Sequence, residues 1–134
     1  MGFKRKAMGS EVYDYPVELV WKSIAGKSDV TIDPLDEDTY NSREPDRNTV
    51  FTRAIEVRQN EFFSFQIKSQ MFFANWEISL EPISACRTRV TVKDTVEFRK
   101  TAAVLLTGFG SSIRHEIRYF LKDLGGKLKQ YDKK

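Results

Sequence analysis

The period of the hydrophobic residues changes along the chain, and this change constrains the fold more than any other feature of the sequence. Between residues 49 and 99, apolar side chains recur at every second position, which is typical of half-buried strands. Four such segments cover residues 49–57, 62–69, 72–81 and 87–99. The breaks between them are short, and short breaks join antiparallel neighbours because parallel strands need long crossovers. The pattern therefore predicts an antiparallel meander.

Beyond residue 112 the apolar residues take up helical spacing, which predicts one long amphipathic helix. The apolar stripe comprises Ile113, Ile117, Phe120, Leu121, Leu124 and Leu128. Glycines accompany this stripe, and each glycine inside a helix costs about 1 kcal/mol relative to alanine. We therefore expect an irregular start over residues 108–111 and a kink or a close backbone approach at Gly125 and Gly126. A stripe this wide needs a broad apolar partner, and the predicted sheet is the only candidate.

The first third of the chain is less regular. A short helix is predicted to start at Pro16, because proline suits the first helical position, and Gly26 can end it. Residues 6–15 could form an opening strand, whereas residues 27–48 predict turns around one short strand near 30–35. The apolar face of the short helix comprises Val17, Val20, Trp21 and Ile24.

Length and composition narrow the class of protein. With 134 residues, of which 40% are hydrophobic and 31% charged, the chain fits one globular domain over residues 1–134. Cys86 is alone, which excludes an intrachain disulfide or a CxxC site and fits a cytoplasmic location. No apolar stretch approaches the roughly 20 residues of a membrane-spanning helix, so we expect no stable membrane insertion. The net charge of +3 is mixed in sign along most of the chain, and we expect no nucleic-acid partner.

Two stretches of sequence resemble a known superfamily. YPVELVWKSIAG is similar to the opening helix of START-like (SRPBCC) proteins, and WEISLEPISACRTRVTVKDTVEF followed by the helix at 113–131 resembles their late hairpin and closing helix. That superfamily includes birch-pollen-allergen-like proteins, polyketide cyclases and dehydrases, and lipid-transport proteins. The glycine-rich loop of the allergen-like members and the Trp-x-Pro pattern of cyclase-like members are both missing, so no subfamily is indicated.

The resemblance implies an α+β helix-grip fold, in which a curved antiparallel sheet wraps around a long C-terminal helix. It also implies a cavity between sheet and helix that binds lipids, polyketides or other apolar compounds. Some members of the superfamily are enzymes and many are carriers.

The strand pattern defines a candidate ligand-binding set. Aromatic and aliphatic side chains share one face of each strand, so they would point toward the closing helix and could line a cavity. The alternative is that they pack against the helix and leave no room for a ligand. The residues that we predict to contact a ligand are Arg53, Phe63, Phe65, Trp76, Ile78, Asp94, Phe109, Ile117 and Phe120.

Arg53 and Asp94 stand out because each occupies a position where the alternation places an apolar residue. In the strand of Arg53, the inward set would be Phe51, Ile55 and Val57. A buried charge must be paired or hydrogen-bonded. We therefore expect either that the two charged residues anchor a ligand carboxylate or hydroxyl, or that a β-bulge or an edge salt bridge keeps them in solvent.

Residues suited to catalysis or metal binding are sparse. His115 is the single histidine and falls off the apolar stripe, so we expect it at the surface, with no metal site and no cofactor. Arg114, Arg118 and Lys122 recur every four residues as a basic ridge. Such a ridge could meet anionic lipid or nucleic acid, but it is also typical of a solvated helix face.

Three functions stay open at this point. The first is the binding or carriage of a small, lipid-like or polyketide-like apolar molecule by a monomer or homodimer. The second is an enzyme of the cyclase or hydrolase kind, with Asp94 or a tyrosine as the proton-handling group. The third is a protein-interaction module that holds no ligand.

Overall fold

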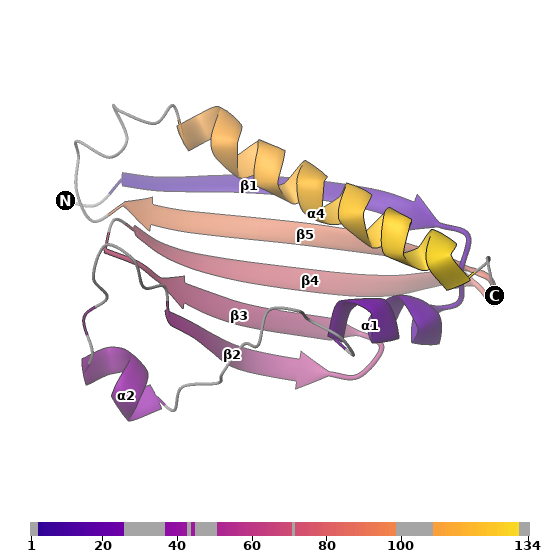
Figure 1. The fold of residues 1–134 in the computed structure, drawn as a ribbon, viewed down its shortest axis with the longest axis horizontal. Helices are drawn as coiled ribbons and strands as arrows, with labels where there is room; N and C mark the ends of the chain where they lie inside the picture. The colour runs from indigo at the N-terminus through magenta and orange to yellow at the C-terminus, as the bar shows by residue number, and fades with distance from the viewer. Residues whose placement is uncertain are drawn as a thin grey trace.

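A computed structural model describes residues 3–25, 37–42, 44, 51–70, 72–98 and 109–131. Its elements form one antiparallel sheet, with two helices between the first and second strands and one helix after the last strand (Figure 1). In chain order they are β1 (Phe3–Tyr13), α1 (Val17–Ala25), α2 (Glu37–Ser42), β2 (Phe51–Arg58), β3 (Phe62–Lys68), β4 (Phe72–Ser84), β5 (Arg87–Phe98) and α4 (Phe109–Tyr131).

The strand order of the sheet is β1-β5-β4-β3-β2, and every neighbouring pair is antiparallel. The predicted meander is confirmed, since β2 to β5 follow one another as hairpins. The opening strand is confirmed as well, although it starts earlier than expected and pairs with β5 at the far end of the meander. The last strand of the meander therefore lies beside the first strand of the chain.

The closing helix α4 runs along the sheet over β1 and β5 (Figure 1). Its apolar stripe is buried except for the half-buried Phe120, and Ile117 and Leu128 are both at most 2% exposed. The side chains beneath the helix come from alternate positions of β5, where Val90 and Val92 are fully buried. Each such aliphatic side chain contributes about 1.5–3 kcal/mol when it leaves water. The predicted contact between the closing helix and the apolar face of the sheet is confirmed, and we call this side of the sheet the helix-bearing face.

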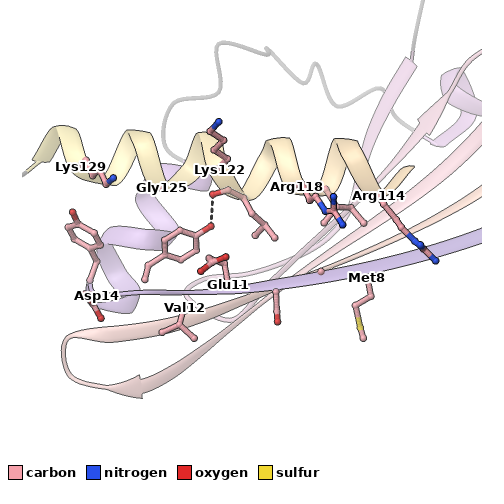
Figure 2. Close-up of a pocket in the computed structure, with 15 residues that line it drawn as sticks. Met8, Glu11, Val12, Asp14, Arg114, Arg118, Lys122, Gly125 and Lys129 are labelled. Atoms are coloured by element: carbon pink, nitrogen blue, oxygen red, sulfur yellow. Dashed lines mark hydrogen bonds between the residues drawn. The ribbon is translucent and has the colours of Figure 1, made fainter. Parts of the chain in front are cut away.

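Two residues of β1 set how closely α4 approaches the sheet. Gly9 lies directly beneath the helix, where an added Cβ would stand 2.7 Å from Cγ2 of Ile117. The Tyr13 hydroxyl donates a 2.6 Å hydrogen bond to the carbonyl of Leu121, drawn as the dashed line in Figure 2. Burial raises the pKa of Tyr13, so this hydroxyl stays protonated and remains a donor. The helix is thus held against β1 by close packing of Ile117 on Gly9 and by the buried hydrogen bond from Tyr13 to Leu121.

The glycines of α4 behave differently from the sequence-based expectation. The helix already includes Gly110, so the predicted irregular start is wrong for the described residues, and helical structure continues through Gly125 and Gly126. The close approach at Gly125 is confirmed, because a Cβ there would lie 3.4 Å from Cε1 of Tyr13. A Cβ at Gly126 would meet no atom within 4 Å. Packing of the apolar stripe outweighs the helix propensity that these glycines forfeit.

Helix α1 matches the predicted short helix. The carbonyl of Pro16 accepts hydrogen bonds from the backbone N–H groups of Leu19 and Val20, which closes the first turn. The expected end at Gly26 and the expected strand near 30–35 both lie outside the described residues. Helix α2 falls in the segment for which only turns and that one strand were predicted.

Helix α2 is fixed to the sheet through a buried lysine. Lys68 at the end of β3 is 4% exposed, and its Nζ donates a 2.9 Å hydrogen bond to the carbonyl of Tyr40. Nζ also lies 3.7 Å from Oε1 of Glu44. Because Lys68 pairs with Phe73 across the ladder, both point away from the helix-bearing face, and α2 covers part of what we call the opposite face.

Candidate functional site

Strand register decides which side chains meet on the helix-bearing face. Directly paired residues of neighbouring strands point to the same side of a sheet. Trp76 of β4 lies opposite Phe65 of β3 on one flank and opposite Asp94 of β5 on the other. Ile78 of β4 likewise lies opposite Phe63 of β3. The predicted inward residues of β3 and β4 therefore share one face of the sheet. The hairpins thereby bring aromatic rings and one carboxyl group together.

A row of aromatic rings crosses this face. Phe65 stacks on Trp76 with ring centroids 5.8 Å apart, and Phe120 of α4 contacts Trp76 edge-on with a centroid distance that is also 5.8 Å. Phe63 continues the row at 5.5 Å from Phe65, and Trp21 of α1 closes it at 6.4 Å from Phe63. Phe63, Phe65 and Phe120 are only half-buried, so the row offers apolar surface that the described residues do not fully cover.

A small cavity of about 80 Å³ opens beside this row, under the first turns of α4. Its lining includes Trp76, Asp94, Ile113 and Glu116, together with aliphatic and aromatic side chains of β3, β4 and β5. A single water molecule needs about 30 Å³ of liquid volume. The cavity is therefore large enough for one functional group of a ligand rather than for a whole lipid.

Asp94 is the polar centre of this cavity. It is 2% exposed, and its Oδ1 has no hydrogen-bond partner among the described residues. Burial, and to a smaller extent the nearby carboxyl group of Glu116, together raise the pKa of Asp94 to about 7. Near neutral pH the carboxyl group is therefore about half protonated and can donate or accept a hydrogen bond. An unsatisfied, partly protonated acid inside an apolar face is a feature of binding and catalytic sites.

Arg53 does not join Asp94, and the expectation that both face the same interior is wrong. Arg53 lies opposite Gln66, which places it on the opposite face of the sheet. Strict alternation fails in β2 because the register shifts between Ala54 and Glu56, so residues before and after that bulge face different sides. The β-bulge named as an alternative is therefore present.

The same bulge changes the predicted inward set of β2. Val57 shares the side of Phe63, as expected, but Phe51 lies opposite Lys68 on the other face. Ile55 sits at the bulge and is exposed.

The remaining predicted contacts fall into two groups. Ile78 and Ile117 are fully buried in the core, so they support the site without offering surface to it. Phe109 is the first residue of α4, and its side chain lies outside the described residues. Glu116 was missed, although helical spacing could have found it, since it stands three residues after Ile113 and four before Phe120.

His115 is exposed, as predicted. No group of three or more His, Cys, Asp or Glu side chains that could hold a metal ion occurs within the described part of the chain. Among the same residues, none of the helices combines the length and the apolar character needed to cross a bilayer.

No protein-family model matches the chain, and no curated protein matches it at a significant level. Solved structures do resemble it. A protein of unknown function, SA2116 from Staphylococcus aureus, aligns over 99% of this chain and 98% of its own with a TM-score of 0.72 at 9% identity. A START superfamily protein from Mycobacterium smegmatis aligns over 94% and 98% of the two chains, with a TM-score of 0.65 at 12% identity.

The allergen-like branch of the fold is also represented. Ara h 8.0201 aligns over 96% of this chain and 99% of its own, with a TM-score of 0.63 at 11% identity. At such low identities the likeness concerns the fold alone. The chain has the START-like helix-grip fold, an α+β arrangement of an antiparallel sheet and a C-terminal helix, as its sequence predicts.

Proposed function

We propose that the helix-bearing face binds a small, largely apolar molecule that carries one neutral hydrogen-bonding group. The observation that carries this proposal is the buried Oδ1 of Asp94, which has no partner among the described residues and lies at the end of an aromatic row. A buried polar atom without a partner costs about 1–3 kcal/mol. A ligand carbonyl or hydroxyl in the cavity would remove that cost, since the protonated carboxyl can donate to it.

The apolar body of such a ligand would lie along the half-buried rings of Phe65 and Phe120. Aromatic rings offer large apolar contact areas with few rotatable bonds, which suits the capture of flat or chain-like molecules. Helix-grip proteins as a class fit this role, because the fold places an apolar sheet face beneath a helix. Binding or carriage is favoured over catalysis because the described residues that line the cavity include neither a tyrosine nor a histidine.

The aromatic row can be tested with prodan, a neutral naphthyl ketone whose emission moves to shorter wavelength when it leaves water. We expect the protein to bind prodan and the Phe65→Ala variant to bind it about tenfold more weakly, since one ring of apolar contact is lost. Phe73→Ala is the matched control, because Phe73 belongs to the neighbouring strand but faces the opposite side. Affinity would be measured by fluorescence titration on variants that show an unchanged far-UV spectrum. Equal weakening in both variants, or no binding by the unaltered protein, would contradict the proposal.

The role of Asp94 predicts a pH dependence of the same binding. With a pKa of about 7, the protonated fraction of Asp94 falls about tenfold between pH 6 and pH 8. Prodan carries only an acceptor at its carbonyl, so its affinity is expected to fall by a similar factor over this range. Asp94→Asn keeps a donor at all pH values, and its affinity should stay constant from pH 6 to pH 8. A pH profile that is the same in both proteins would remove Asp94 from the site.

A further inference from the structure

A second site is suggested by the outer edge of the sheet. β1 stands at the end of the strand order and pairs with β5 alone among the described strands. Its other edge therefore carries backbone N–H and C=O groups that no described strand engages. A groove of about 870 Å³ runs between this edge and α4. Tyr13 and Leu121 connect the two walls, so the hydrogen bond between them fixes the width of the groove.

The helix wall of this groove is basic. Arg114, Arg118, Lys122 and Lys129 line it, and none of them forms an ion pair with an acidic group of the described residues. Figure 2 shows Arg114 and Arg118 extending from α4 toward β1.

The lining also holds two carboxylates, Glu11 and Asp14. Asp14 is engaged by Arg87 at 2.9 Å, which leaves Glu11 as the one acid that faces the basic wall without an ion pair of its own. Cations are therefore in excess in the groove.

We propose that this groove binds an extended, acidic peptide segment that adds to β1 as a further strand. The added strand would satisfy the open backbone groups of β1, as peptides do in other proteins with an exposed sheet edge. Its acidic side chains would meet the arginines of α4, which makes the recognition electrostatically complementary.

The spacing of the basic residues indicates which acidic pattern fits. Arg114 and Arg118 are four residues apart on α4, which corresponds to about 6 Å along the helix axis. Alternate residues of a strand point to the same face and lie about 6.7 Å apart. Acids at every second position of the peptide would therefore have nearly the same spacing as cations at every fourth position of the helix. Lys122 also lines the groove, but Figure 2 shows its side chain directed away from β1, so the match rests on the two arginines.

A second copy of this chain is a poorer occupant. Antiparallel pairing of two β1 edges would place both α4 helices on the same side of one continuous sheet. Their basic flanks would then face each other, and like charges at close range oppose association. An acidic strand removes this conflict, so the charge of the groove selects against self-pairing.

Two synthetic peptides of identical composition test the proposal. Acetyl-Thr-Glu-Val-Glu-Val-Glu-Thr-amide has acids at alternate positions, whereas acetyl-Thr-Val-Glu-Glu-Glu-Val-Thr-amide has them side by side. We expect the full chain to bind the first at least tenfold more tightly by calorimetric titration at low salt. Amide hydrogen exchange of β1 should slow when the first peptide is bound, because strand addition engages its backbone. Equal affinity for both peptides, or unchanged exchange in β1, would overturn the proposal.

Charge variants complete the test. Arg118→Glu should weaken the alternating peptide at least tenfold, while Lys22→Glu, which makes the same charge change on α1 outside the groove, should alter affinity less than twofold. Glu11→Gln should tighten binding, since it removes a carboxylate that repels the peptide. If Arg118→Glu and Lys22→Glu weakened binding equally, the peptide would be responding to the overall positive charge of the protein rather than to the groove. Tighter binding of an oligothymidylate or of phosphatidylserine vesicles than of the peptide would also overturn the assignment.

Discussion

Replacement of Asp94 by asparagine is expected to raise the free energy of unfolding by roughly 3 kcal/mol at pH 8 and to leave it almost unchanged at pH 5. The carboxyl group has its pKa raised by burial to about 7 from an ordinary value of 3.8. The folded state therefore binds a proton more tightly than the unfolded state, and stability falls as the pH rises from about 4 to 7. Above pH 7 the full penalty of about 4 kcal/mol persists. Asparagine cannot ionise, so it avoids this penalty at the cost of about 1 kcal/mol for an unpaired amide donor.

The measurement is urea denaturation of both proteins at the two pH values, followed by circular dichroism. Asp123→Asn is the matched control, because Asp123 is exposed on α4. Its Oδ2 lies 3.3 Å from Nζ of Lys127, which makes this a surface ion pair. Such pairs contribute at most about 1 kcal/mol. A gain from Asp94→Asn that is equal at pH 5 and pH 8 would mean that the carboxyl group does not ionise in a buried environment.

Gly9→Ala is expected to lower the free energy of unfolding by about 2 kcal/mol. The added methyl group would stand 2.7 Å from Cγ2 of Ile117, which no pair of carbon atoms tolerates. Cγ2 of Ile117 is bonded directly to the β-carbon of a branched side chain inside the core. It cannot rotate out of the way, so α4 must shift. The smaller entropy loss of alanine in a strand offsets only part of this cost.

Gly126→Ala is the control for this prediction. It is expected to stabilise the protein by about 1 kcal/mol, since the new methyl meets nothing within 4 Å and alanine is the better helix former. A double-mutant cycle with Ile117→Ala would locate the clash, because the methyl added at position 9 should partly fill the space left by the shortened side chain. Additive effects of the two substitutions would place the strain elsewhere.

The architecture could be predicted because two periodic patterns dominate it. Alternation marks a strand that is buried on one side only, and Trp76 and Asp94 reached the same face because each obeys that alternation. Short hairpin connections then set the neighbours of each strand. The helix stripe from Ile113 to Leu128 is regular over four turns, and its width alone required a sheet beneath it.

Features that break a period could not be predicted. The bulge in β2 adds one residue to a ladder. It leaves no mark in a strand that is half-buried up to Ala54 and exposed from Ile55 onward, and so Arg53 was placed on the wrong side. Helix α2 has six residues, too few to show a helical repeat. Lys68 occupies a position that normally faces water, and only the arrival of α2 from a distant part of the sequence buries it.

Part of the candidate site could be predicted from the sequence and part of it could not. The aromatic row follows from the register of β3 and β4 together with one residue of α4. The meeting of Glu116 with Asp94 depends on where along β5 the helix crosses, which no local pattern determines. The raised pKa of Asp94, on which two of the predictions depend, is therefore a property of tertiary packing rather than of either segment.

The position of β1 has a consequence for how the chain acquires its structure during synthesis. The hydroxyl of Tyr13 finds its acceptor 108 residues later, in a helix that is synthesised after all five strands. The hairpins of β2 to β5 join near neighbours and can form early, whereas β1 must wait for β5 and α4 before it has anything to bind. Closing so long a loop is slow because its entropy is lost before any contact repays it. A nascent chain of this kind therefore keeps β1 exposed to chaperones and to other chains until β5 and α4 have been synthesised.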